Sequence, residues 1–233
     1  MNPCTWQSWD GDDQMTGDGD LVSRLEAIPY SGAIIDILQE QGLRNQGLPW
    51  RIQPMTTGQA VVGRALTIVG EQRADGERDD YFEPFLRMLG EVKPGDVLVS
   101  QPNDNSCAHL GELSAETAQF RGARGAVIDG GVRDVDYLNR LGFPVFACYR
   151  TPVDIVGRWT LTDFNVPITI GEVDVHPGDY IVGDIDGVVV IPQDIADEVT
   201  AMAEQVVQTE DVVRRQILEG VHPLEAYRAH GRF

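Results

Sequence analysis

The chain of 233 residues has little of what several classes of protein require. Its three cysteines, Cys4, Cys107 and Cys148, are scattered, which favours reduced thiols and a cytoplasmic location over a disulfide framework. Its longest apolar runs, such as GVVVIP at 187–192, are far too short to span a bilayer. No stretch has the pattern of a signal peptide, so we expect none.

Positive charge is also scarce. The formal net charge is −19, which argues against nucleic acid or an anionic membrane as the main partner, because both require a basic face. The single lysine, Lys93, lies in the turn VKPGD, where we expect it to be solvated. Chemistry that needs a buried, activated lysine, such as Schiff-base formation, therefore has almost no candidate.

Two common binding motifs are missing or incomplete. The sequence has no GxGxxG, the fingerprint of dinucleotide binding. Cys107-Ala-His109 could begin a zinc site, but no second pair follows at a useful spacing.

The order of the predicted elements indicates one mixed α/β domain over residues 20–233, preceded by an irregular arm at 1–19. Ser31 is predicted to cap a helix that ends at Gly42, and Asp80 with Glu83 resembles a capping box for a second helix. From residue 90, strands alternate with helices, which implies parallel strands with crossover helices. The predicted strands are 60–70, 96–100, 125–130 and 143–149, with helices at 111–122 and 135–142; short strands in antiparallel hairpins follow over 165–191, and a long helix over 193–220.

The stretch DGGVRDVDYL, residues 129–138, places Arg133 and Asp134 between a predicted strand and a predicted helix. Aspartate at a helix start is most often a cap for the backbone N–H groups. Gly130-Gly131 would also let a ligand approach the backbone, and Glu112 lies at the corresponding turn one crossover earlier. The pair is thus either a helix cap or a site for an anion and a metal.

The segment GELSAETAQFRGARGAVIDGGVRDVDYLNRLGFPVFA resembles the family of the class II 4-hydroxy-4-methyl-2-oxoglutarate aldolases. That family also contains the 4-carboxy-4-hydroxy-2-oxoadipate aldolases and the regulator of ribonuclease activity A. The matching residues are Gly111-Glu112 and Arg133-Asp134, and PGDYIVGDIDGVVVIP at 177–192 is also similar to a family segment. The likeness extends over about residues 25–220.

The resemblance implies an α/β fold with a layered β/β/α swivelling core, like a phosphohistidine domain, and flanking helices. It implies homotrimers or hexamers with sites between subunits. It implies that Asp134 ligates Mg²⁺ or Mn²⁺ and that Arg133 binds the pyruvyl part of an oxo-acid substrate. The implied roles of the remaining residues are carboxylate binding by the backbone of Gly111, Glu112, Leu113 and Ser114, orientation of water by Glu112, and an acidic contribution from the C-terminal helix of a neighbouring subunit, best matched by Glu210 and next by Glu204.

The activity implied by the resemblance is metal-dependent cleavage of a 4-hydroxy-2-oxo dicarboxylic or tricarboxylic acid to pyruvate and a second oxo acid. The pyruvate enolate also forms when oxaloacetate loses CO₂, so decarboxylation is expected as well. Arg150, Arg158 and the N-terminal arm are candidates to contact the group on C4, with packing or surface roles as the alternative. The ribonuclease-regulator branch supplies a non-catalytic alternative, and the acidity of this chain is compatible with it.

Overall fold

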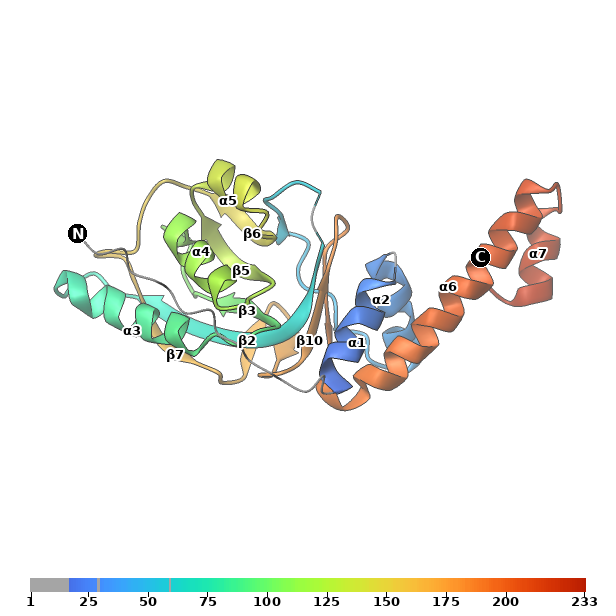
Figure 1. Ribbon diagram of the computed structural model, residues 1–233, viewed down its shortest axis with the longest axis horizontal. Coiled ribbons are helices and arrows are strands. Elements are labelled where there is room, and N and C mark those ends of the chain that lie inside the picture. The colour runs from blue at the N-terminus through green and yellow to red at the C-terminus, as the bar shows by residue number, and fades with distance from the viewer. Residues whose placement is uncertain (1–16, 29, 59) are drawn as a thin grey trace, which may run out of the picture.

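The computed structural model describes residues 17–28, 30–58 and 60–233, and its main feature is a nine-stranded sheet (Figure 1). The arm predicted for 1–19 falls almost entirely outside the described residues, and helix α1 already begins at Gly17. The strands are β1 (Gln53–Pro54), β2 (Val61–Gln72), β3 (Asp96–Gln101), β4 (Ala108–Leu110), β5 (Gly125–Val132), β6 (Val145–Arg150), β7 (Trp159–Phe164), β8 (Ile168–Ile170), β9 (Val173–Val175), β10 (Tyr180–Gly183) and β11 (Val188–Ile191). The helices are α1 (Gly17–Glu26), α2 (Ser31–Glu40), α3 (Arg78–Glu91), α4 (Glu112–Phe120), α5 (Val135–Leu141), α6 (Ala196–Leu218) and α7 (Pro223–His230).

The centre of the sheet is parallel, as the alternation of strands and helices predicted. β2 pairs with β3, β3 with β5 and β5 with β6, each in parallel register. The connections between them contain α3, α4 and α5, which lie together on one side of the sheet in Figure 1. The mixed α/β class is therefore confirmed.

The second half of the chain adds antiparallel strands. β10 pairs with β11 and with β2, and β8 pairs with β9 in a separate two-stranded sheet. The predicted change from crossovers to hairpins is confirmed. The sequence did not predict β4, which pairs with β5, or β7, which pairs with β2.

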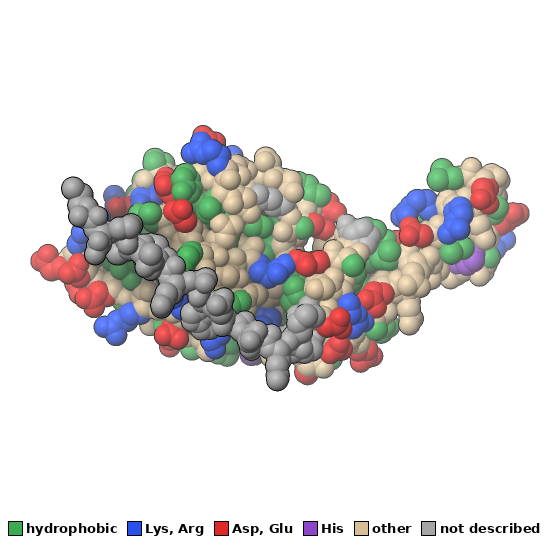
Figure 2. All heavy atoms as spheres, viewed as in Figure 1, with side chains coloured by type: hydrophobic (Ala, Val, Ile, Leu, Met, Phe, Trp, Pro, Cys, Tyr) green, Lys and Arg blue, Asp and Glu red, His purple; other side chains and the backbone are tan. Residues whose placement is uncertain are grey.

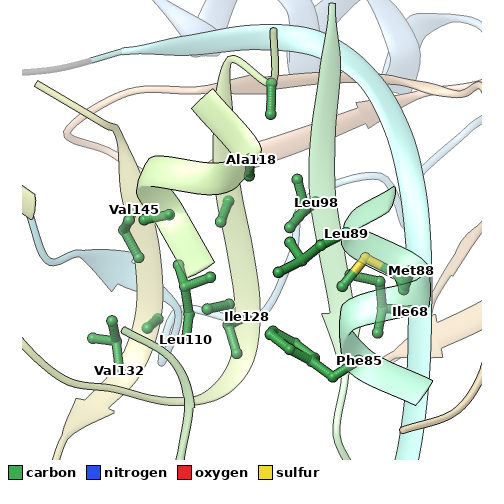
Figure 3. Packing of buried hydrophobic residues seen from close by; sticks show 14 of the residues in the cluster. Ile68, Phe85, Met88, Leu89, Leu98, Leu110, Ala118, Ile128, Val132 and Val145 are labelled. Carbon is green, nitrogen blue, oxygen red and sulfur yellow. The ribbon is translucent and has the colours of Figure 1, made fainter. Parts of the chain in front are cut away.

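The two faces of the parallel strands bury different sets of side chains, because side chains alternate along a strand. Leu98 of β3 faces α3 and α4 in a cluster with Phe85, Met88 and Ile128 (Figure 3). Val97 and Val99 belong to a cluster on the other face, which includes the side chains of the β8–β9 hairpin. A third cluster joins α1, α2 and α6 to β10 and β11. α6 then runs away from the sheet, with α7 beside its far end (Figure 1).

Two predicted helix caps are wrong in detail. Ser31 is the first residue of α2, and no side chain of the N-cap residue Tyr30 caps it. The cap comes from Asp184, whose carboxylate accepts hydrogen bonds from Ser31 N at 2.6 Å and from Ser31 Oγ at 2.9 Å. The capping box of α3 is Glu77 with Asp80, three residues earlier than Asp80 with Glu83. In α2 the cap is a residue far away in sequence, and in α3 it is the residue that flanks the helix. Each takes the place of the residue predicted from the local pattern as the partner of free N–H groups in the first turn.

The surface carries charged side chains of both signs (Figure 2). On the face shown in Figure 2, acidic and basic side chains are interspersed, and no continuous basic area is seen. Among the described residues, no helix is long and apolar enough to cross a membrane.

Candidate active site

The pairing of β4 with β5 brings together the two turns singled out from the sequence. Ala108 pairs with Gly131 and Leu110 with Val132, so the two parallel strands end side by side. The backbone N–H of Arg133 donates to Leu110 O at 3.0 Å, which extends this pairing by one residue. Gly111 at the start of α4 therefore lies against the Arg133-Asp134 turn at the start of α5.

Asp134 occupies the N-cap position of α5, but its carboxylate serves the neighbouring helix. Its backbone is left-handed, with φ 59° and ψ 32°, and its side chain makes no cap bond to α5. The Oδ2 oxygen accepts a hydrogen bond from Glu112 N at 3.0 Å, at the first residue of α4. Arg133 Nε lies 3.5 Å from the same oxygen. The left-handed turn, an unusual conformation for a residue other than glycine, directs the carboxylate across to the start of α4.

Gly111 leaves no room for a side chain. A Cβ atom at this position would lie 2.7 Å from Asp134 Oδ2 and 3.0 Å from Arg133 Nε. Its φ of −142° is extended backbone that any residue adopts, so close approach and not conformation requires glycine here. The N–H groups of Leu113 and Ser114 follow in the first turn of α4, where backbone donors have no partner within the helix and attract anions.

Two hollows adjoin the Arg133-Asp134 turn. The first has a volume of about 500 Å³ and is lined by the start of α4, by α3 and by Asp154. The second, of about 650 Å³, is lined by α5 residues and by Arg150. Arg133, Asp134 and Glu112 line both. Arg133 and Asp134 have side chains that are 38% and 40% exposed, so a small anion and a cation can reach them.

The donor atoms around Asp134 fit a hard divalent cation. Both recorded contacts of the carboxylate use Oδ2, and among the described residues Oδ1 makes no hydrogen bond or ion pair. Two further acidic residues, Glu112 and Asp154, line the same hollow. Mg²⁺ and Mn²⁺ prefer oxygen ligands and retain several waters, so one or two protein carboxylates beside open space suit them.

The two acidic residues predicted from the C-terminal helix lie elsewhere in this chain. Glu210 accepts a hydrogen bond from the hydroxyl of Tyr30, and burial together with this bond raises the pKa of Tyr30 to about 12. Glu204 forms an ion pair with Arg24, with two N–O distances of 2.9 Å. Neither residue lines either hollow. A contribution of Glu210 or Glu204 to the site of another subunit stays a prediction.

A second cluster of potential ligands lies under the first hollow. Asp104, Cys107 and His109 are buried, and their side-chain atoms are 3.2 to 3.6 Å apart. Three such ligands could hold a metal ion. Their hydrogen bonds instead indicate a network in which these side chains bond to one another and to the backbone. His109 Nδ1 accepts from Gly131 N at 3.2 Å, so the neutral ring carries its proton on Nε2, which then donates to Asp104.

The protonation of this network follows from its surroundings. Burial lowers the pKa of His109, which keeps the ring neutral near pH 7. Burial alone would raise the pKa of Asp104, but hydrogen bonds from Ser106, Cys107 and Gln72 outweigh it and lower the pKa to about 2. Burial also raises the pKa of the Cys107 thiol to about 12. An ionised carboxylate surrounded by neutral donors therefore holds the loop that leads into β4.

One sequence interpretation is wrong. Gly130-Gly131 does not open the backbone to a ligand, because protein side chains fill that space. A Cβ atom at Gly130 would lie 2.6 Å from His109 Nδ1, and one at Gly131 would lie 2.4 Å from the ring of Tyr149. The glycines let the network under the hollow pack against β5.

Comparisons with known proteins show the family of the chain. The family described as "RraA-like: Aldolase/RraA" matches residues 31–190, and the chain belongs to this family. It is 34% identical over 209 residues to a Halalkalibacterium halodurans protein named "Putative 4-hydroxy-4-methyl-2-oxoglutarate aldolase", covering 89% of this chain and 93% of that protein.

Solved structures are also similar. An uncharacterised protein from Pseudomonas syringae pv. tomato has a TM-score of 0.81 and 28% identity, covering 91% of this chain and 94% of that one. Streptomyces coelicolor RraAS2, described as an unusual member of the RNase ES inhibitor RraA protein family, has a TM-score of 0.74 and 30% identity, covering 85% and 98%. The family thus includes relatives named for an enzyme activity and relatives named for inhibition of a ribonuclease.

The apolar wall of the first hollow and the buried Asp104 were missed from the sequence. Phe82, Phe85, Leu86 and Leu89 of α3 line the hollow, although two strands, β3 and β4, separate α3 from α4 in the sequence. The signal available was the apolar face of that helix, which the sequence shows but does not orient.

Proposed function

We propose that this chain is a divalent-metal-dependent aldolase that cleaves a 4-hydroxy-2-oxo acid to pyruvate and a second carbonyl compound. The observation that carries the proposal is the Asp134 carboxylate, which lies beside Arg133 and the first N–H groups of α4 at the meeting point of two hollows. A carboxylate ligand, a guanidinium and free backbone donors are what a metal ion and a 2-oxo carboxylate need. The curated relative named for this activity supports the same proposal.

The residues have separate roles in the proposed reaction. Asp134 would hold Mg²⁺ or Mn²⁺, which when bound supplies a Lewis acid for the 2-oxo group. The backbone N–H groups of Leu113 and Ser114 bind the substrate carboxylate at the start of α4. Arg133 donates to the 2-oxo oxygen and stabilises the negative charge that develops there.

Cleavage also requires a proton acceptor for the C4 hydroxyl. Glu112 of the same chain and Glu210 of a neighbouring subunit are the candidate carboxylates, acting directly or through a water molecule. As the proton leaves, the C3–C4 bond breaks and its electron pair moves onto the pyruvate enolate. Protonation at C3 then gives pyruvate. Oxaloacetate forms the same enolate on losing CO₂, so decarboxylation is expected at the same site.

Further parts of the proposal rest on the sequence resemblance to the family. These are a dicarboxylic or tricarboxylic substrate of the 4-hydroxy-4-methyl-2-oxoglutarate or 4-carboxy-4-hydroxy-2-oxoadipate type, and homotrimers or hexamers with sites between subunits. They also include a cytoplasmic location and a single domain over residues 20–233 with a β/β/α core like a swivelling phosphohistidine domain.

A pyruvate assay with and without the metal tests the function. Purified protein is given 4-hydroxy-2-oxo acids or oxaloacetate with Mg²⁺ or Mn²⁺, and pyruvate is followed by a coupled lactate dehydrogenase. We expect EDTA to abolish the activity and Asp134→Ala to reduce kcat/KM by about 100-fold or more, because it removes the metal ligand. Calorimetry should show weaker Mn²⁺ binding to the same variant.

Asp75→Ala is a matched control, because Asp75 has a fully exposed side chain (100%) and lines neither hollow. It should retain wild-type activity and metal binding. If no substrate in the panel yields pyruvate and Asp134→Ala binds Mn²⁺ as the wild type does, the aldolase proposal is wrong.

A non-catalytic regulator is the second candidate. Two observations favour it: the net charge of −19 and the similarity to a Streptomyces protein of the RNase ES inhibitor family. The Asp134→Ala variant separates the two functions. Inhibition of an RNase ES-type ribonuclease that survives this substitution, in a protein that releases no pyruvate, would support the regulator.

A further inference from the structure

The two strands that lead into the candidate site are both irregular just before they reach it. The register of β4 with β5 shifts between Ala108 and Leu110, so that His109 is an extra residue in β4. The register of β5 with β6 shifts between Ile128 and Gly131. Bulges of this kind bend a strand and change the direction of the residues that follow. The relative placement of the two turns of the site is therefore decided at these positions.

The side chain of His109 joins the two irregular positions. Its Nδ1 atom accepts a hydrogen bond from the backbone N–H of Gly131 at 3.2 Å, and its Nε2 atom lies 3.2 Å from Asp104 Oδ2. A Cβ atom on Gly130 would lie 2.6 Å from Nδ1, so the ring lies directly against the irregular part of β5. The ring also packs edge-on against Trp159, with 5.0 Å between the ring centroids. Because the side chain is 1% exposed, all of these contacts are made within one chain.

The two bonded residues have equivalent places in the two halves of the site. His109 comes two residues before Gly111, and Gly131 comes two residues before Arg133. Between them and the site, the N–H of Arg133 donates to Leu110 O at 3.0 Å. A buried N–H group without an acceptor is unfavourable, so β5 would shift to find another partner if the bond to the ring were lost. That shift would move Arg133 relative to Gly111.

We propose that His109 is a positioning residue of this site. By accepting the N–H of Gly131, its Nδ1 atom fixes the end of β5 against β4, and with it the placement of Arg133 and Asp134 at the start of α4. The bond from Nε2 to Asp104 has a separate effect, since it holds the ring and the loop before β4 and so contributes to stability. The expected effect on catalysis rests on the proposed function, whereas the effect on the geometry needs neither substrate nor metal.

Two substitutions of His109 separate its two hydrogen bonds. The Oδ1 atom of asparagine is as many bonds from the backbone as Nδ1 of histidine, so His109→Asn retains an acceptor for Gly131 and loses the donor to Asp104. The Nε2 atom of glutamine is as many bonds from the backbone as Nε2 of histidine, so His109→Gln retains the donor and loses the acceptor. We therefore expect the asparagine variant to keep the site in place and the glutamine variant to be the more stable of the two.

Hydrogen exchange of single amides measures the geometry without turnover. The amides of Gly131 and Arg133 both lie in the contact between β4 and β5. In the full-length protein without metal, His109→Gln should speed the exchange of both amides by about tenfold or more, and His109→Asn should speed it by much less.

His222→Gln is the matched control for this exchange experiment. The Nδ1 atom of His222 also accepts a backbone N–H, that of Leu224, at 3.2 Å, but the bond lies at the start of α7. The substitution should leave the amides of Gly131 and Arg133 at their wild-type exchange rates.

Turnover and metal binding should follow the same order as the exchange rates. We expect His109→Gln to lower kcat/KM for pyruvate release by about 10- to 100-fold, and His109→Asn to lower it by no more than about threefold. Calorimetry should show weaker Mn²⁺ binding to the glutamine variant, and thermal unfolding should give the asparagine variant the lower melting temperature. A purely structural role would instead make activity fall in parallel with the melting temperature.

The protonation of the ring in the wild-type protein tests the proposal without any substitution at the site. ¹⁵N NMR of labelled histidine should show His109 with Nδ1 unprotonated and Nε2 protonated, and this result decides even where a variant fails to fold. A proton on Nδ1 would overturn the proposal, as would wild-type exchange rates and activity in His109→Gln. A wild type that releases no pyruvate, with the expected order of exchange rates, contradicts the aldolase alone.

Discussion

Gly111 is the residue on which the geometry of the candidate site depends most closely. Its missing side chain lets the carboxylate of Asp134 and the guanidinium of Arg133 approach the start of α4. The constraint is local, because neither the backbone conformation of Gly111 nor the core of the sheet requires glycine.

Gly111→Ala should therefore impair the site and leave the fold intact. The added Cβ would displace Asp134 and Arg133, so we expect kcat/KM for pyruvate release to fall by about 10- to 100-fold, with weaker Mn²⁺ binding. Circular dichroism should be unchanged and the melting temperature nearly so. Gly90→Ala is the control, since a Cβ there meets nothing within 4 Å. Equal activity in the two variants would show that the close approach has no functional role.

At this scale the sequence predicted the important residues but not their contacts. The Arg133-Asp134 turn was correctly expected beside a helix start, and Asp134 does occupy an N-cap position. Which helix receives its carboxylate could not be predicted, because that depends on the three-residue strand β4. A strand so short, within a polar loop, has no periodic pattern to distinguish it.

Among the elements, the loop between β3 and β4 is organised by one buried charge. Asp104 accepts hydrogen bonds from Ser106 N at 2.9 Å, Ser106 Oγ at 2.8 Å and Gln72 at 3.0 Å, besides its contact with His109. These donors link β2, the loop and β4. Asp104 thus holds in place the loop and β4, which lead to Gly111.

Asp104→Asn should destabilise the protein by roughly 2 to 4 kcal/mol at pH 7, because the amide turns an NH₂ group towards donors that lose their acceptor. The folded carboxyl has a pKa of about 2, below the usual value near 3.9, so its stabilising effect is present above about pH 4 and disappears as the pH falls towards 2. The difference in melting temperature between wild type and variant should therefore narrow over this range.

Acid should weaken both proteins through His109 as well. The pKa of its buried ring is lowered, so below about pH 6.5 the unfolded chain binds a proton that the folded ring does not, and stability declines. Exposed Asp75→Asn should follow the wild-type curve at every pH. A gap between wild type and Asp104→Asn that stays constant from pH 5 to 2 would contradict the assignment of an ionised, stabilising carboxylate.

Elements with strong local patterns were predicted well. β3, β5, β6, α4 and α5 lie where apolar runs, helix caps and terminal glycines indicated. β7 was missed because its partner β2 ends at Gln72, far away in sequence. The cap of α2 by Asp184 was missed for the same reason.

For the whole molecule, α6 extends beyond the sheet with α7 beside its end (Figure 1). Several apolar side chains near this end are exposed, among them Leu218 at 81% and Phe233 at 78%. Glu210 lies on the same helix and bonds to Tyr30 of its own chain. An arm of this kind suits contact with another copy, which is where the predicted contribution of Glu210 would arise.

Mixing two inactive variants tests this intersubunit site. If Asp134 and Glu210 in one site come from different chains, equal amounts of Asp134→Ala and Glu210→Gln, unfolded and refolded together, should regain about a quarter of wild-type activity. Light scattering should report trimers or hexamers throughout. Asp134→Ala mixed with Glu112→Gln should regain nothing, because these residues lie in one chain. Full activity of Glu210→Gln alone would show that the residue has no catalytic role.

The pairing of β2 has a consequence for how the chain is made. One edge of β2 pairs with β3, whereas the other is divided between β10 at Val61–Arg64 and β7 at Ile68–Gln72. When the ribosome has released the chain only as far as residue 155, β2 to β6 are available for folding, but β7 and β10 are not. During that interval an apolar strand edge is bare, and a growing chain in that state is open to pairing with a second nascent chain or to capture by a chaperone.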